Sequence, residues 1–240
     1  MQDITEIDGH SIGIVYLTFG SSSAKGALLS YQSLLQLGVR IPATSIGTVA
    51  LPDIRLVPWS GRAPWHPEEG EGKFYAGEIK PFLCDLSPYD WTLYLDADTE
   101  FYGNPVPGFE KLRDFDILGR EHEIKIRAAL AWRQSWWSRA GIFKTIEYCG
   151  ERAPLFNTGV LFFRKTPDVR ELFQDWYSQW VKYPVWDEQL ALMRAMAEHP
   201  EIKKEVLPVQ WNGKEKIPGQ IIRHFFGSGR SRDGDPRATT

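Results

Sequence analysis

Residues 91–99 read Trp-Thr-Leu-Tyr-Leu-Asp-Ala-Asp-Thr, and this stretch decides the fold class. The run up to Leu95 is apolar enough to predict a short strand buried inside a sheet. It ends abruptly at Asp96 and Asp98. Residues i and i+2 of extended backbone point to the same side, so both carboxylates can face one cation. Ligands of α/β sheets bind outside the carboxyl ends of strands, and the stretch therefore predicts a site as well as a sheet.

The segments around this strand alternate between strand and helix patterns. Residues 12–19 form a near-continuous apolar run that ends in a predicted turn, Gly20-Ser-Ser-Ser. Residues 24–37 then carry apolar side chains at helical spacing. Further strands are predicted at 53–57, 114–118 and 160–163, with an apolar segment at 221–226, and helices at 78–86, 167–182 and 187–198. The alternation predicts one α/β domain over residues 1–230, with a mostly parallel central sheet, flanking helices and a polar tail at 231–240.

The composition excludes several classes of protein. The chain has 240 residues, 42% of them hydrophobic, and a formal net charge of −3, which argues against wholesale disorder and against a strongly basic nucleic-acid binder. Two cysteines, Cys84 and Cys149, cannot build a disulfide scaffold. The first residues lack the pattern of a secretory signal, and no apolar run approaches the about 18 residues of a membrane span. We therefore expect a soluble, cytoplasmic protein.

The two aspartates point to a metal site. Paired carboxylates suit a hard divalent ion such as Mg²⁺ or Mn²⁺, which keeps coordination positions open for substrate phosphates. The alternative is a strand-end turn in which an aspartate caps the backbone. Asp-x-Asp is a common pattern by itself, and the apolar strand before it favours the metal site.

Residues 93–99 resemble the Asp-x-Asp motif of nucleotide-sugar glycosyltransferases with the GT-A fold, and most closely glycosyltransferase family 8, the group that includes glycogenin and galactosyltransferases. Three further segments follow in the family's order: Phe156-Asn-Thr-Gly-Val160, Trp186-Asp-Glu-Gln189 and His224-Phe-Phe-Gly227. The resemblance spans about residues 12–230. It implies one Rossmann-like GT-A domain that moves a hexose from a nucleotide-diphosphate sugar, with UDP expected, to a hydroxyl acceptor with retention of configuration.

The resemblance also assigns roles to residues. Asp96, Asp98 and His224 would hold the metal against the donor's diphosphate, and a mixed oxygen and nitrogen set favours Mn²⁺ over Mg²⁺. The implied donor-binding residues are Thr18, Phe19, Gly20, Lys80, Asp96, Ala97, Asn157, Gly159, Gly227 and Arg230. The family's Lys-Pro-Trp after the late glycine is absent here, and Arg230 stands near the position of its lysine.

Several of these residues have a structural alternative. Phe19 also fits an ordinary core position, and Lys80 fits a solvated charge on a helix. Asn157 to Gly159 are expected to form a turn beside the sugar, although a plain turn before a strand fits equally. A lone histidine such as His224 is often a capping or core residue.

The catalytic residues implied by the resemblance are Asp187, Glu188 and Gln189. One carboxylate would orient the donor sugar, and Gln189 would lie near the anomeric carbon. The sequence leaves open which of the two acids takes that role. An acidic pair is also typical of the first turn of a helix, whose dipole favours negative charge.

The acceptor is not specified by the sequence: protein, glycan, lipid head group and modified DNA base all fit. The aromatic and basic stretch with Trp132, Arg133, Trp136, Trp137 and Arg139 suits sugar stacking, base stacking or a core helix. Trp59 and Trp65 lie in or beside a long predicted loop at 58–77 and could add to an acceptor wall. The rival functions are a transferase acting on a modified DNA base, a non-catalytic sugar-nucleotide or glycan binding module and, with less support, a nucleotidyltransferase.

Overall fold

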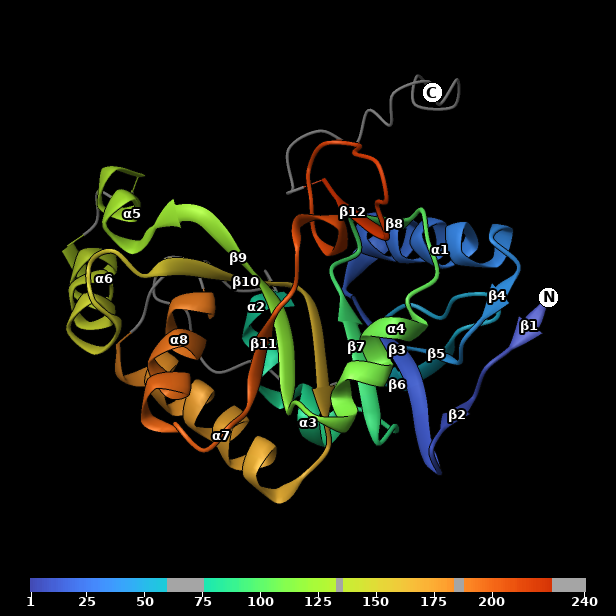
Figure 1. The fold of residues 1–240 in the computed structure, drawn as a ribbon, viewed down its shortest axis with the longest axis horizontal. Coiled ribbons are helices and arrows are strands. Elements are labelled where there is room, and N and C mark those ends of the chain that lie inside the picture. Colours follow the sequence, from blue (N-terminus) through green and yellow to red (C-terminus); the bar gives the residue numbers. More distant parts are fainter. Residues whose placement is uncertain (60–75, 133–135, 184–187, 226–240) are drawn as a thin grey trace.

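The computed structural model describes residues 1–59, 76–132, 136–183 and 188–225. Its centre is an eight-stranded sheet with the strand order β11-β9-β10-β7-β3-β5-β6, in which β2 pairs with β3 (Figure 1). The strands are β2 (Glu6–Ile7), β3 (His10–Thr18), β5 (Ala43–Gly47), β6 (Arg55–Pro58), β7 (Trp91–Leu95), β9 (Ile117–Lys125), β10 (Pro154–Arg164) and β11 (Lys204–Val206). Two smaller sheets pair β1 (Gln2–Asp3) with β4 (Val39–Arg40), and β8 (Thr99–Phe101) with β12 (Ile222–His224).

The sheet is mostly parallel, which confirms the predicted α/β class. Strands β7, β3, β5 and β6 pair in parallel, and so do β11 and β9. Strand β10 runs antiparallel to both of its neighbours, β7 and β9. Because of this reversal, the beginning of β10 lies at the same edge as the end of β7.

Helices cover both faces of the sheet (Figure 1). They are α1 (Gly20–Gln36), α2 (Ala76–Ile79), α3 (Leu83–Leu86), α4 (Val106–Glu110), α5 (Ile126–Trp132), α6 (Trp136–Cys149), α7 (Pro167–Lys182) and α8 (Glu188–Glu198), with single 3₁₀ turns η1 (Lys80–Phe82), η2 (Lys111–Arg113) and η3 (Val209–Trp211). Within β3, Val15 packs in the core beneath α7 and α8, whereas Ile14 and Tyr16 pack in the core beneath α1 and α4. This alternation buries the strand on both faces, as its apolar run predicts.

The predicted bounds of β7 and α7 are confirmed. Helix α7 begins with signals typical of a helix start, since Pro167 occupies its first turn and the Thr166 side chain accepts a hydrogen bond from the backbone of Val169. The predicted turn after the first strand is wrong. Gly20, at φ +82°, already opens α1, and Ser23 donates a hydrogen bond to the backbone oxygen of Phe19 instead of extending a loop.

Three other predictions are corrected in detail. The helix expected at 78–86 is divided into α2, η1 and α3, because Pro81 has no backbone N–H to continue an α-helical ladder. Strand β9 starts at Ile117 and continues to Lys125, beyond the predicted 114–118. Asn157 to Gly159 lie inside β10, at a register shift opposite β9, and do not form a turn.

Across the described ranges, no helix combines the length and apolar character that a membrane crossing requires.

Candidate metal and donor site

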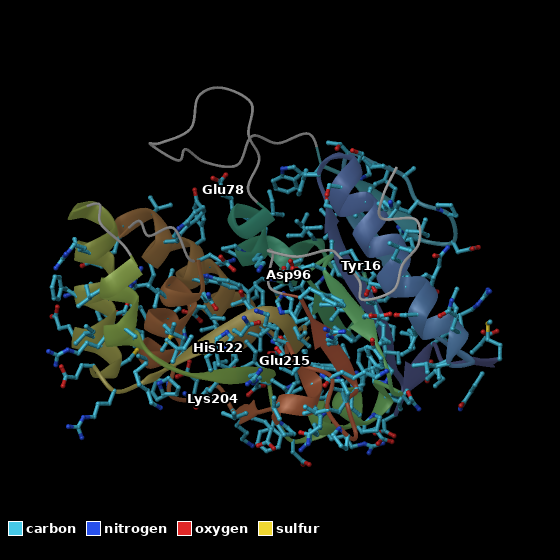
Figure 2. All side chains as sticks on the ribbon, turned by 90° about the horizontal axis from the view of Figure 1, so that it is seen from above. Tyr16, Glu78, Asp96, His122, Lys204 and Glu215 are labelled. Carbon is cyan, nitrogen blue, oxygen red and sulfur yellow. The ribbon has the colours of Figure 1, made fainter. Side chains whose placement is uncertain are left out.

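The carboxyl end of β7 carries a cluster of three potential metal ligands. Asp96 and Asp98 follow the strand, and β12 pairs His224 with Thr99 just beyond them. The imidazole Nε2 of His224 lies 3.2 Å from Asp98 Oδ1 and 3.7 Å from Asp96 Oδ2. One ligand atom from each residue lies within 4.8 Å of the others. The structure thus brings the three predicted ligands together, and Figure 2 shows Asp96 near the middle of the molecule.

The surroundings of this cluster fit a divalent cation. Two carboxylates and one imidazole nitrogen form a donor set that can hold a divalent metal ion. Gly159 faces the cluster from β10, where an added Cβ would lie 2.1 Å from His224 Cε1 and 2.7 Å from Asp96 Oδ2. Its backbone oxygen accepts a 2.8 Å hydrogen bond from the Asp96 amide. The missing side chain at this position therefore keeps the space between two of the ligands open.

Lys80 is a buried part of the site and not a solvated helix charge. Its ammonium group lies 2.9 Å from Glu188 Oε1 and 3.1 Å from Asp96 Oδ1. It also donates a 3.2 Å hydrogen bond to Thr158, whose hydroxyl donates to Glu188 at 2.6 Å. Burial by itself lowers the pKa of Lys80, but the charges of Asp96 and Glu188 outweigh it and raise the pKa above its usual value. Lys80 is therefore held as a cation.

Tyr94 fixes the other side of the Asp96 carboxylate. Its hydroxyl donates a 2.5 Å hydrogen bond to Asp96 Oδ1 from a buried position on β7. Burial, followed by the negative charge of Asp96, raises the pKa of Tyr94 well above its usual value. The phenol stays protonated and remains a donor, which limits the conformations open to the first aspartate.

The acidic segment before α8 is partly described. Glu188 turns toward Lys80 and Thr158, whereas Asp187 lies outside the described residues. Gln189 places its side-chain oxygen in a buried position that has no hydrogen-bond partner among the described residues. Trp176 donates a hydrogen bond to the backbone oxygen of Glu188 and fixes the start of the helix.

The remaining predicted donor contacts lie near the same edge or outside the described ranges. Thr18 is fully buried at the end of β3, and Phe19 is half-buried and packs against the core beneath α7. The backbone oxygen of Ala97 packs tightly against α1, where a Cβ on Gly26 would approach it to 2.5 Å. Gly227 and Arg230 lie outside the described residues, and so do Arg133 and Trp65, which were predicted for the acceptor side. Nothing is described for the side chains of Trp132, Trp136 and Trp137, while Arg139 is exposed and Trp59 packs against Phe82.

Three residues next to the cluster were not identified from the sequence. Asn212, just after η3, accepts a 2.9 Å hydrogen bond on Oδ1 from His224 Nδ1. Its amide nitrogen donates to Asn157 Oδ1 at 2.7 Å, and Asn157 in turn contacts His122 on β9. Burial, followed by the nearby charge of Arg120, lowers the pKa of His122 to about 4. Tyr94 also belongs to this group, and the alternation of β7 places it on the opposite face from Leu93.

Comparison with known proteins gives one family match and several structural neighbours. Residues 92–214 match the family model described as nucleotide-diphospho-sugar transferase. The structure of mouse xyloside xylosyltransferase 1 in its apo form superposes with a TM-score of 0.57 at 14% identity, covering 93% of this chain and 99% of that one. Galactosyltransferase LgtC in complex with donor and acceptor sugar analogs gives 0.57 at 14% identity, covering 90% and 87%. GlyE of Streptococcus pneumoniae TIGR4 gives 0.54 at 14% identity, covering 90% and 55%.

These identities show a shared fold and no more. No curated protein sequence matches the chain.

Proposed function

The chain belongs to the nucleotide-diphospho-sugar transferase family, and we propose that it is a metal-dependent glycosyltransferase of the family 8 type. In this proposal it transfers a hexose from a UDP-sugar to a hydroxyl acceptor with retention of configuration. The observation that carries the proposal is the cluster of Asp96, Asp98 and His224 at the carboxyl end of β7. Sheets of this kind bind ligands at that edge.

The cluster would hold Mn²⁺, or Mg²⁺ as the second choice. When bound, the ion supplies positive charge that stabilises the leaving diphosphate. Tyr94 and Lys80 both contact the Asp96 carboxylate and keep it in place. Gly227 and Arg230 follow His224 in the chain and would contact the diphosphate through backbone amides and a guanidinium.

Glu188 is the carboxylate that we assign to the donor sugar. Lys80 and Thr158 both bond its Oε1 and fix the group in one orientation. A fixed carboxylate can bind sugar hydroxyls without an entropic cost at each turnover. Gln189, whose buried oxygen has no partner in the described part of the chain, would lie near the anomeric carbon, with Asp187 beside it.

The nucleoside end of the donor would lie at the end of β3. Thr18, Phe19 and Gly20 occupy that strand end, and Ala97 follows the neighbouring strand β7. The half-buried ring of Phe19 offers an aromatic surface on which a base can stack.

The test is donor hydrolysis with water in place of the acceptor. Purified protein is mixed with Mn²⁺ and single nucleotide sugars, and nucleotide release is measured. We expect release from a UDP-hexose that EDTA abolishes and that Asp98→Asn lowers by at least about 100-fold. Asp114→Asn, an exposed aspartate at the end of η2, is the matched control and should keep full activity.

A second readout separates the enzyme from a binding module. Donor plus Mn²⁺ should raise the melting temperature of the wild-type protein, as ligand binding to the native state must. Turnover without any need for metal would contradict the proposed metal dependence. Binding of a donor without turnover, unchanged in Asp98→Asn, would favour a non-catalytic binding module.

A further inference from the structure

We propose that Asn212 and Asn157 are positioning residues that determine which nitrogen of His224 carries the proton, so that Nε2 presents its lone pair to the metal site. The inference rests on the proposed metal site. It concerns two side chains that would act on the ligand without touching the metal. A ligating histidine needs a partner on its other nitrogen to fix the tautomer and the ring orientation.

The direction of the hydrogen bonds starts from a backbone amide. The N–H of Gly159 lies 2.8 Å from Asn157 Oδ1. A backbone N–H can only donate, so the side-chain atom that faces it must be the amide oxygen. The NH₂ group of Asn157 is then the atom 2.9 Å from His122 Nε2. His122 accepts at that nitrogen.

The same reasoning continues through Asn212. Its side-chain atom nearest Asn157 lies 2.7 Å from an oxygen that can only accept, so this atom is the NH₂ nitrogen. The Asn212 oxygen therefore faces His224 Nδ1 at 2.9 Å. Because that oxygen also only accepts, Nδ1 must carry a hydrogen. In the neutral ring that a metal ligand requires, Nε2 is then unprotonated and faces Asp98 and Asp96.

We call the hydrogen bonds that run from Gly159 through Asn157 and Asn212 to His224 the relay, and its side chains are buried. Asn212 is fully buried, and Asn157 and His224 are 6% and 3% exposed. Water cannot readily replace the lost partners, so each broken link leaves a buried polar group unsatisfied. Arg120 donates to the backbone oxygen of Asn212 and holds that segment against β9.

Asn157 therefore has a role other than the one implied by the resemblance. Its oxygen accepts from Gly159 and Asn212, and its nitrogen donates to His122. Both polar atoms of the side chain are engaged within the protein. We assign it to orienting His224 instead of to a direct sugar contact.

The experiment measures Mn²⁺ binding without donor, by titration calorimetry and by the electron paramagnetic resonance signal of free Mn²⁺. Asn212→Leu removes the acceptor for Nδ1–H and is expected to weaken Mn²⁺ binding by about 10- to 100-fold. Asn157→Leu should weaken it as well. Asn157→Asp keeps an oxygen that accepts from Gly159 and Asn212, so its Mn²⁺ affinity should stay within about threefold of wild type. If position 157 mattered only for packing, this charged substitution would weaken Mn²⁺ binding as much as Asn157→Leu does. Asn104→Leu is the matched control, since Asn104 is exposed and bonds only the backbone of Val106 among the described contacts.

A spectroscopic readout tests the tautomer directly in metal-free protein. The chain has five histidines, so ¹⁵N-labelled rings can be resolved, and His224→Gln assigns the signal. We expect a hydrogen on Nδ1 that donates to Asn212 in the wild type, and loss of that hydrogen bond in Asn212→Leu. A wild-type ring without a hydrogen on Nδ1 would overturn the inference, and this holds whether or not the leucine variants fold. So would a folded Asn212→Leu that binds Mn²⁺ as tightly as the wild type.

The two proposals fail separately. If the wild type binds no Mn²⁺ yet shows the expected tautomer, the metal function is wrong and the relay stands. If Mn²⁺ binds but the tautomer is the opposite one, the relay is wrong and the metal site stands.

Discussion

Replacing Gly159 by alanine should remove metal binding through one methyl group. The new Cβ would lie 2.1 Å from His224 Cε1 and 2.7 Å from Asp96 Oδ2. Carbon atoms in ordinary contact are about 3.5–4.0 Å apart, so the imidazole must move by about 1.5 Å. Metal–ligand distances tolerate only about 0.2 Å. The displaced His224 can no longer complete the cluster with Asp96 and Asp98.

The size of the effect follows from these distances. Disturbing only an outer partner of a ligand typically costs about 10- to 100-fold in affinity, and displacing the ligand itself should cost more. We therefore expect Gly159→Ala to weaken Mn²⁺ binding by at least about 100-fold. Insertion of a methyl group into packed surroundings also costs about 1–3 kcal/mol of unfolding free energy. Both quantities are measurable, by calorimetric titration and by urea unfolding.

Gly13→Ala is the matched control. In β3, its Cβ would lie 2.2 Å from the ring of Tyr89, a comparable overlap near the other end of the sheet. It should lose stability to a similar extent and keep the Mn²⁺ affinity of the wild type. If folded Gly159→Ala binds Mn²⁺ within twofold of Gly13→Ala, the steric reasoning and the assigned ligand set are both refuted.

Two further perturbations test the surroundings of the site, and a third tests an ion pair elsewhere in the fold. Lys80→Met leaves the partly buried Glu188 and Asp96 carboxylates without their cation and should cost up to about 3–5 kcal/mol in unfolding free energy, measured by urea titration. Adding Glu188→Gln to this variant should recover part of the loss. Tyr94→Phe removes one charge-assisted hydrogen bond to Asp96 and should lower the unfolding free energy by about 1.5–3 kcal/mol. Combined with Glu188→Gln, the two losses of unfolding free energy should simply add. Burial by itself lowers the pKa of His199, but its two carboxylate partners outweigh burial and raise the pKa above its usual value. The ion pairs of this ring therefore stabilise the native state fully below about pH 6.5, and this stabilisation is lost as pH rises through the raised pKa. His199→Gln should therefore lower the urea midpoint more at pH 6 than at pH 9, and an equal loss at both would contradict the assigned charge.

The parts of the fold that the sequence predicts are those with strong local patterns. Strand β7 has a dense apolar run and an abrupt polar end, and α7 has apolar spacing with a proline start and a proline soon after its end. Strand β5 has no such pattern. Its residues Thr44 and Ser45 are fully buried although they are small and polar, because the strand lies between β3 and β6. No local rule identifies a buried strand of that composition.

The same distinction applies to the site. Asp96 and Asp98 are adjacent to their strand and could be read from it, while His224 was found through the resemblance. Asn212 and His122 belong to no motif in the sequence. Their importance depends on where η3 and β9 pass beside β12 and β10, which is a property of tertiary packing.

The antiparallel course of β10 explains why this site is assembled from such distant segments. Pairing of Val160 with Leu95 places the start of β10 beside the end of β7, and Gly159 then accepts the amide of Asp96. A parallel β10 would put those residues at the opposite edge of the sheet. Within β10, the Gly159 amide donates to Asn157 Oδ1 two residues earlier, and this local bond begins the chain of hydrogen bonds that ends on His224. The change of strand direction therefore brings both Gly159, which leaves open space beside the ligands, and Asn157, which begins the hydrogen bonds to His224, to the edge where β7 ends.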